Sequence, residues 1–222
     1  MQLRELSGLT GVPIASIKFY LREGLLPPGR RLTATRSDYG EAHARRIATI
    51  QTLRGVNDLS IAQIRAITAL IDAGASRVEI MKSLQREVQS LGEPVPGRTE
   101  AGNAVVALRG WPDVPTAARG ALDAHLEEMD RLGIAVPLSA LDVYSRAVDL
   151  IAHVDLDDAA SAENLDALVA RVAVGMHMRR ELVLKLLALA QTSRSIAMYG
   201  RAPGPNGALP PGPDVPTSQV TA

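Results

Sequence analysis

The stretch Leu3–Leu26, LRELSGLTGVPIASIKFYLREGLL, reads as two short helices joined by a tight turn. The glycines of GLTG, residues 8–11, predict the break between them. In the second helix, expected over residues 13–23, Ile14, Ile17 and Leu21 recur at spacings of three and four residues. These spacings place the three side chains on one helix face, which is therefore expected to be buried.

The opposite face of this second helix carries polar side chains and one aromatic ring. At about 100° per residue, Phe19 is predicted to point outward with Ser16 and Arg22, while Lys18 and Tyr20 lie at the flanks. Cations that bind phosphates, with a ring against a sugar or a thymine methyl group, suit a nucleic-acid surface. An amphipathic helix pair in an ordinary helical domain has the same pattern, so this stretch alone leaves both interpretations open.

A polar, basic segment follows the two helices. The residues LLPPG at 25–29 end the second helix, and Arg30, Arg31 and Arg36 lie in the segment that then runs to Tyr39. This composition predicts a small β-hairpin with an arginine-bearing tip.

With these features in order, the N-terminal region resembles the MerR family of bacterial transcription regulators. The likeness rests on IKFYLREGLLPP, the basic segment ending in Tyr39, EAHARRIATIQTLR and LSIAQIRAI, and it covers about residues 1–72. It implies a winged helix-turn-helix. Two positions depart from the family pattern: Phe19 replaces a phosphate-binding hydroxyl that Tyr20 keeps, and Asp38 stands where relatives often have arginine before the closing tyrosine.

The resemblance implies DNA contacts from the second helix, the wing and the helix after the wing. Ser16 and its neighbours are expected near base edges, and Arg45 and Arg46 near the DNA backbone because they lie just beyond the wing. The full expected set is Ser16, Lys18, Phe19, Tyr20, Arg22, Arg30, Arg31, Arg36, Arg45 and Arg46.

Composition predicts a mainly α protein in which the wing is the exception. Of the 222 residues, 46% are apolar but only 3% are aromatic, so the core must consist mainly of Leu, Ile, Val and Ala. The absence of cysteine excludes disulfides and thiolate metal sites.

The net charge of zero hides an asymmetry between the two parts of the chain. Residues 1–72 contain ten basic and six acidic side chains, a net charge of +4, which leaves −4 on the remainder. A basic N-terminal region is what a DNA-binding domain needs. No signal-like segment and no apolar run of about 18 residues occurs, so a cytoplasmic location without a membrane partner is expected.

The region after the wing predicts further helices. Ser60 and Gln63 match a capping box that starts a helix ending near residue 72, and we place the end of the DNA-binding domain, 1–74, there. In the next segment, 75–92, apolar residues at helical spacing fit a core face and a dimer seam equally well. The resemblance favours a dimerisation helix. The apolar stripe comprises Val78, Met81, Leu84, Val88 and Leu91.

The C-terminal part is predicted to be an all-α domain, for sensing or dimerisation, over residues 99–200, after a linker at 93–98. It has a diffuse likeness to the helical C-terminal regions of actinobacterial MerR-like regulators. A Pro- and Gly-rich tail at 201–222 is expected to be disordered. Helices are expected near 99–109, 114–132, 138–153, 161–173 and 175–199, with an acidic turn at 155–158.

Other chemistry is weakly indicated. His153 with the acids at 155–158 reads as a helix end and a solvated turn, and the triplet Met176–Met178 points to different sides of a helix, so we expect no metal site. No nucleophile elbow, phosphate-binding glycine loop or HExxH motif occurs, so neither a cofactor nor enzymatic activity is expected. Trp111 and Tyr144 are aromatic candidates for a ligand pocket, although such residues are more often core.

By resemblance, the predicted function is that of a homodimeric regulator that binds an inverted repeat in double-stranded DNA between promoter elements. RNA polymerase is a further partner, and a small molecule sensed by the C-terminal half would change DNA twist and activate transcription. The alternative is a ligand-independent repressor or architectural protein whose C-terminal half only dimerises or contacts other proteins. A third hypothesis, from another class, is a metalloenzyme or ligand carrier that uses the C-terminal half.

Overall fold

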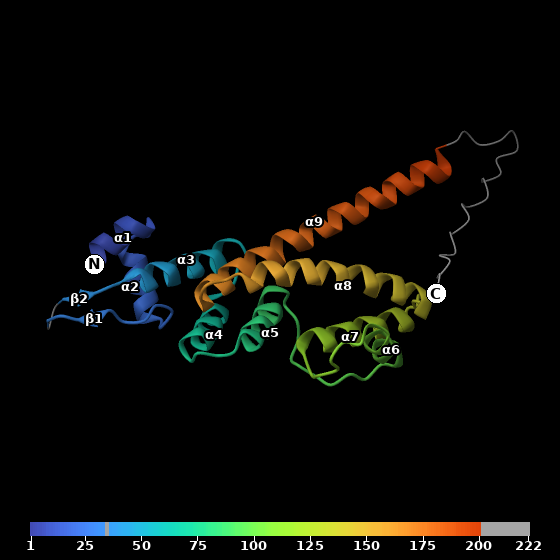
Figure 1. The fold of residues 1–222 in the computed structure, drawn as a ribbon, viewed down its shortest axis with the longest axis horizontal. Helices are drawn as coiled ribbons and strands as arrows, with labels where there is room; N and C mark the ends of the chain where they lie inside the picture. The colour runs from blue at the N-terminus through green and yellow to red at the C-terminus, as the bar shows by residue number, and fades with distance from the viewer. Residues whose placement is uncertain (34–35, 201–222) are drawn as a thin grey trace, which may run out of the picture. The chain divides into compact units, whose positions relative to one another are not determined.

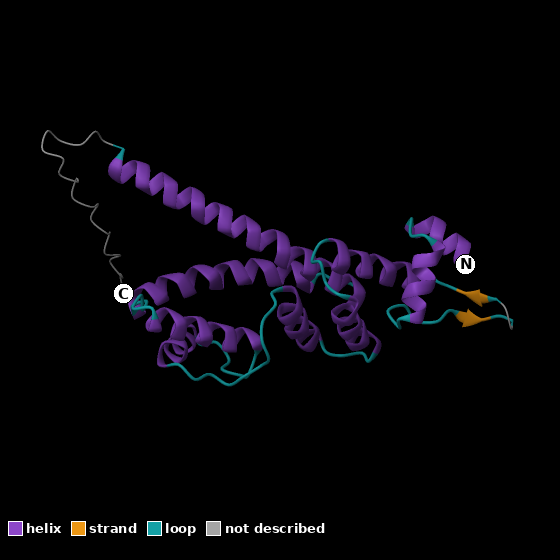
Figure 2. Cartoon of the chain, turned by 180° about the vertical axis from the view of Figure 1, so that it is seen from behind, coloured by secondary structure: helices purple, strands orange, loops and turns teal. Residues whose placement is uncertain are grey.

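A computed structural model describes residues 1–33 and 36–200 of the chain. The chain divides into two compact units, Met1–His177 and Met178–Ala222. The predicted fold class is confirmed: the described chain is mainly helical, with one short antiparallel hairpin (Figure 2). The predicted tail, residues 201–222, lies outside the described residues.

The elements are labelled in Figure 1. They are α1 (Leu3–Thr10), α2 (Ile14–Arg22), β1 (Arg30–Arg31), β2 (Ser37–Asp38), α3 (Glu41–Gly55), α4 (Ile61–Asp72), α5 (Arg77–Val88), α6 (Glu100–Arg109), α7 (Ala117–Arg131), α8 (Leu138–Ala160) and α9 (Leu165–Tyr199). In the hairpin, Arg30 pairs with Asp38 and Arg31 with Ser37.

The first two helices form as a helix-turn-helix pair, with small corrections to the predicted turn. Helix α1 continues through Gly8, and the chain turns at Gly11, whose φ of 70° is the left-handed conformation that glycine adopts easily. Pro13 is the N-cap of α2 rather than part of its first turn. Ile14, predicted to be buried, is 37% exposed, because Tyr20 instead joins Ile17 on the buried side of α2.

One hydrophobic core holds helices α1 to α5 together. Leu6 of α1 and Ile17 of α2 are fully buried with Ile47 of α3 and Ile64 of α4. The predicted capping box at Ser60 is present, since its hydroxyl accepts the Gln63 N–H at 3.3 Å.

Helix α5 turns most of its apolar stripe into this same core. Ile80 and Leu84 are fully buried there, Met81 and Val88 pack against it, and Val78 is 62% exposed. This face of α5 is therefore occupied within the chain.

The end of α8 and the start of α9 complete the core of the N-terminal helices. Leu168, Val169 and Val172 of α9 are buried in the cluster that contains Leu6 and Ile17. Polar contacts reinforce this packing. The Asn57 amide donates to the Ala173 carbonyl at 3.0 Å, Arg77 Nη2 donates to the Ala162 carbonyl at 2.8 Å, and Thr49 Oγ1 donates to the Asp166 carbonyl at 3.2 Å.

Helices α6, α7 and α8 surround a second, smaller cluster of Val105, Leu126 and Leu141. The segment 93–98 is fixed against α7, because Val95 forms a bridge with Thr116 and the Arg98 N–H donates to Asp123 Oδ2 at 3.0 Å.

Two predicted helix breaks in the C-terminal half are wrong. The acidic residues 155–158 belong to α8, which continues to Ala160. Helix α9 runs without interruption through residues 173–175. Aspartate is only a moderately poor helix former, and a single glycine such as Gly175 costs about 1 kcal/mol in a helix without ending it.

The described part of the second unit is the distal segment of α9, from Met178 to Tyr199, followed by Gly200. Its apolar side chains include the exposed row Leu182, Leu186, Leu189 and Ile196, at spacings of four, three and seven residues. Among the described helices, none is both long enough and apolar enough to cross a membrane.

Candidate nucleic-acid interface

The C-terminal end of α2 is held by its own turn and by α4. The Tyr20 carbonyl accepts the N–H groups of Leu25 at 2.9 Å and Leu26 at 3.2 Å, and both leucines are buried. From α4, Arg65 donates to the Glu23 carbonyl at 2.9 Å and to its carboxylate at 2.8 Å. Sequence reasoning gave Arg65 no role, since its partner lies 42 residues away. These contacts fix α2 on the core.

The exposed side of α2 presents two cations. Lys18 and Arg22 are exposed, and Ser16 is half-buried beside them. Phe19, predicted to face outward, is half-buried and packs against the core. The Arg22 guanidinium carbon lies 5.3 Å from the centre of the Phe19 ring, a cation–π distance. Phe19 therefore positions Arg22 more than it offers a free ring.

Tyr20 lies inside the core rather than on the surface of α2. Its side chain is 5% exposed and meets Phe19 edge-on, with ring centres 6.0 Å apart. The three-residue spacing from Ile17 is a signal that predicts this burial. We leave Tyr20 out of the interface.

The wing presents arginines on both of its described sides. Arg30 and Arg31 on β1 and Arg36 before β2 are exposed, while the predicted tip residues 34 and 35 lie outside the described residues. Figure 1 shows the hairpin beside α2 within the first unit. Exposed cations from both elements thus lie in one region of the unit.

The base of the wing is tightly packed. A Cβ atom on Gly29 would lie 2.8 Å from the Asp38 carbonyl oxygen and 2.9 Å from the Tyr39 ring, so only glycine fits. Asp38 accepts hydrogen bonds from the Met1 ammonium at 2.6 Å and from Arg30 at 3.3 Å. These contacts, the ammonium first, lower the pKa of Asp38. The carboxylate that departs from the family pattern therefore stays ionised, and its charge is balanced by the Met1 ammonium and Arg30.

Two adjacent arginines of α3 differ completely in environment. Arg45 is half-exposed, with Glu41 at 3.6 Å. Arg46 is buried: Nη2 lies 2.7 Å from Asp72 Oδ1, and Nε lies 2.7 Å from Asp166 Oδ1. Burial by itself lowers the pKa of Arg46, but bonds to the two carboxylates raise it overall, so the side chain stays charged. This geometry does not offer Arg46 to a phosphate, and we leave it out of the interface.

The two aromatic candidates for a ligand pocket line neither of the cavities lined by residues 99–141 and 70–118. Trp111 is half-buried, packs against the cluster of Val105 and Leu141, and donates from Nε1 to Asp149 Oδ1 at 2.6 Å. Tyr144 is 62% exposed on α8. Within residues 1–33 and 36–200, no group of three or more His, Cys, Asp or Glu side chains is arranged to hold a metal ion.

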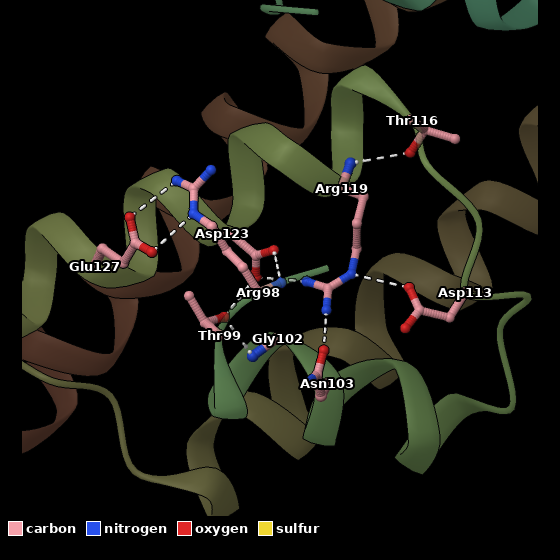
Figure 3. Close-up of polar contacts among 9 residues, drawn as sticks. All are labelled: Arg98, Thr99, Gly102, Asn103, Asp113, Thr116, Arg119, Asp123 and Glu127. Atoms are coloured by element: carbon pink, nitrogen blue, oxygen red, sulfur yellow. Dashed lines mark hydrogen bonds and ion pairs between the residues drawn. The ribbon is translucent and has the colours of Figure 1, made fainter. Parts of the chain in front are cut away.

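A buried polar network joins α6 to α7 (Figure 3). Arg119 donates to Asp113 at 3.1 Å and also to Asn103 and Asp123. Asp123 is fully buried and also accepts from Thr99. Burial by itself raises the pKa of Asp123, but these bonds and that from the Arg98 N–H lower it overall below 3.8. Each charge in the network is paired internally, which indicates a structural role.

Comparison with known proteins supports the interpretation of the N-terminal region. Residues 1–71 match the family described as MerR HTH family regulatory protein. An HTH-type transcriptional regulator ZntR homolog from Haemophilus influenzae is 26% identical over 92 residues, which span 41% of this chain and 67% of that protein.

A solved structure extends the similarity to almost the whole chain. The crystal structure of SCO5550 from Streptomyces coelicolor A3(2), a proposed transcriptional regulator, superposes with a TM-score of 0.62 and 26% identity, covering 91% of this chain and 99% of that one. The described helix-turn-helix, its hairpin wing and the family match agree. The chain therefore carries a MerR-family helix-turn-helix domain at residues 1–71, as MerR-family transcription regulators do.

Proposed function

We propose that this protein is a sequence-specific transcription regulator that places α2 in the major groove of double-stranded DNA and its wing along the backbone. The observation that carries the proposal is the exposure of Lys18 and Arg22 on an α2 helix that the core and Arg65 hold in place. A second helix presented in this way is the reading element of a helix-turn-helix. Its site of action is the cytoplasm, where the DNA is.

Within this interface the side chains have different tasks. Ser16 lies near base edges, and the Phe19 ring positions the Arg22 guanidinium through their cation–π contact. Cations bind phosphates and set the affinity, which makes binding dependent on salt. The phosphate-binding set is Lys18, Arg22, Arg30, Arg31, Arg36 and Arg45.

The experiment that tests DNA recognition is a titration of the purified protein against the promoter DNA upstream of its own gene. Unrelated DNA of equal length serves as competitor, at two salt concentrations. We expect binding that survives a large excess of competitor. Equal affinity for both DNAs would count against this promoter as an operator, and a systematic selection from random duplexes that yields no motif would overturn sequence-specific recognition.

We further propose that the protein acts as a homodimer on an inverted repeat and that the distal part of α9 forms the seam. The α5 face expected to serve this purpose is occupied by the protein's own core. Distal α9 instead exposes a row of Leu182, Leu186 and Leu189. An isolated helix with such a row is marginally stable in water, and pairing with the same row of a second copy would bury it.

The dimer seam is tested by placing one charge in it. Leu186→Lys is expected to convert the dimer to a monomer in analytical ultracentrifugation at micromolar concentration, because a lysine in the seam opposes pairing. Val78→Lys on α5 is the matched control, since Val78 is 62% exposed, and it should leave the dimer intact. Leu150→Lys on α8, at another exposed apolar position, tests whether α8 shares the seam. Dissociation by Val78→Lys with an intact Leu186→Lys dimer would overturn the assignment.

An alternative regulator has no effector. One observation favours it. Ala159, Ala162 and Leu168, around the α8–α9 connection, are buried in the same core as α3, which is expected of a segment that supports the fold permanently. In either form, contact with RNA polymerase at the promoter belongs to the proposal, and a small-molecule effector belongs only to the first.

A further inference from the structure

We propose that a cavity between α6, α7 and the start of α8 binds a small organic cation with an apolar body. The cavity has a volume of about 410 Å³ and is separate from the proposed DNA-binding surface. Ligand pockets in proteins begin at about 300 Å³, so it has room for an aromatic ring with a short chain. The binding site stands on this geometry alone, and only its effect on DNA rests on the proposed function.

The floor of the cavity is apolar and well packed. Leu126 of α7 and Leu141 of α8 line it, and both are buried in the cluster with Val105. Val136 lines it as well and packs against the same cluster. A hydrocarbon or aromatic group would bury apolar surface here, and removal of that surface from water favours binding.

The mouth of the cavity is acidic. Glu100, Glu127 and Asp130 all line it, and no lysine or arginine does. Glu127 accepts two hydrogen bonds from Arg98, at 2.8 and 2.9 Å (Figure 3). Hydrogen bonding to Arg98 is the main cause that lowers the pKa of Glu127. Among the described residues, no cation lies within ion-pair distance of Glu100 or Asp130. Two carboxylates thus remain to attract a positive charge.

The helix ends at the cavity also favour a cation over an anion. Asp130 lies in the last turn of α7, where the helix dipole is negative. The N-terminus of α6, where the helix dipole is positive, also reaches the cavity. However, Thr99 caps this N-terminus by accepting the Gly102 N–H at 3.0 Å, and Glu100 occupies the first turn of α6. A ligand that fits this cavity therefore places its positive charge near Glu100 and Asp130 and its apolar body against Leu126 and Leu141.

The test is a matched series of three probes that share one apolar body: 4-phenylbutylamine, 4-phenylbutanol and 4-phenylbutyrate. Trp111 is the only tryptophan of the chain and packs against the cluster that forms the floor, so its fluorescence reports on binding. Calorimetry gives an independent affinity. We expect the amine to bind at least tenfold more tightly than the alcohol, and the carboxylate more weakly than both. Equal affinity for amine and alcohol would overturn the proposal.

Charge-removing variants locate the site. Glu100→Gln combined with Asp130→Asn should reduce amine affinity at least tenfold while leaving alcohol affinity within twofold. Glu128→Gln is the control on α7, because Glu128 does not line the cavity and pairs with Arg131. Amine affinity of the double variant equal to that of the wild type would exclude this cavity as the site.

A route from the cavity to the DNA-binding domain is provided by α8. Leu138 and Leu141 near one end of this 23-residue helix line the cavity, and Ala159 near the other end is buried in the core of the N-terminal helices. We therefore expect saturating 4-phenylbutylamine to change operator affinity at least threefold in the wild type and not in the double variant. Amine binding without such a change would remove the coupling but leave the site. The proposed function is tested separately, by titration of the protein with operator DNA in the absence of amine. A lack of binding there would count against the proposed function and not against the cavity.

Discussion

The Arg46 Nε atom lies 2.7 Å from Asp166 Oδ1, although the two residues are 120 positions apart in the chain. The same guanidinium binds Asp72 at 2.7 Å through Nη2. One buried cation therefore ties α3 to the end of α4 and to the start of α9. The helix-turn-helix domain is thus supported by a segment far along the chain, at the start of α9.

Arg46→Ala should destabilise the protein strongly. Breaking a buried ion pair costs about 3–5 kcal/mol, and we expect about 2–4 kcal/mol here because Asp72 is partly exposed. Arg45→Ala is the matched neighbour: its exposed pair with Glu41 is worth about 0–1 kcal/mol. Urea denaturation followed by circular dichroism measures both. Equal losses of stability would contradict the different environments of the two arginines.

The fragment 1–92 should not fold stably on its own. It retains helices α1 to α5 but loses Leu168, Val169 and Val172, which are buried in their core. Full burial of one such side chain is worth about 1.5–3 kcal/mol, so their joint loss approaches the total stability of a typical domain, about 5–15 kcal/mol. Thermal melting of the fragment should show no cooperative transition. A sharp melt near that of the full chain would show that the helix-turn-helix is self-sufficient.

Acid should weaken the contact between α6 and α7 through Asp123. The folded pKa of this carboxyl is below its ordinary value of 3.8, so the folded state binds its proton less readily than the unfolded state. Its contribution is complete above about pH 4 to 5 and is lost as the pH falls through the folded pKa. Urea midpoints of the wild type and Asp123→Asn should therefore differ at pH 7, and the difference should shrink as the pH falls below 3.8 and through the folded pKa. A difference independent of pH would contradict this linkage.

Helical periodicity predicted helices in the N-terminal region, the family resemblance implied the winged helix-turn-helix, and both failed at particular residues for identifiable reasons. The spacing of Ile47, Ile50 and Leu53 predicts the buried face of α3, and Arg46 lies four and seven residues before the last two, on the same face. That signal predicts burial of Arg46, whereas the position just beyond the wing favours a phosphate contact. Its partner Asp166 was beyond prediction, because no local pattern connects residues 120 positions apart.

The C-terminal half was less predictable for a related reason. Helix ends there depend on packing as well as on composition. The acidic residues 155–158 therefore continue α8, and α9 runs on through residues 173–175, where a break was expected. Trp111 and Tyr144 were chosen by residue type, and the cavity instead uses aliphatic residues and carboxylates. A cavity arises from the arrangement of three helices and leaves no sequence motif.

The salt dependence of DNA binding tests the central claim most directly. The logarithm of the wild-type binding constant should fall linearly with the logarithm of salt concentration. Arg22→Ala should make this slope shallower by about 0.9, the value for one phosphate contact, and weaken binding to operator and unrelated DNA alike. Arg146→Ala on α8 is the control. Arg146 lies on a different helix from the proposed interface and pairs with Asp142 at 2.7 Å, so the slope of this variant should equal that of the wild type. An unchanged slope for Arg22→Ala, or equal changes for both variants, would contradict the assignment of α2 as the DNA-binding helix.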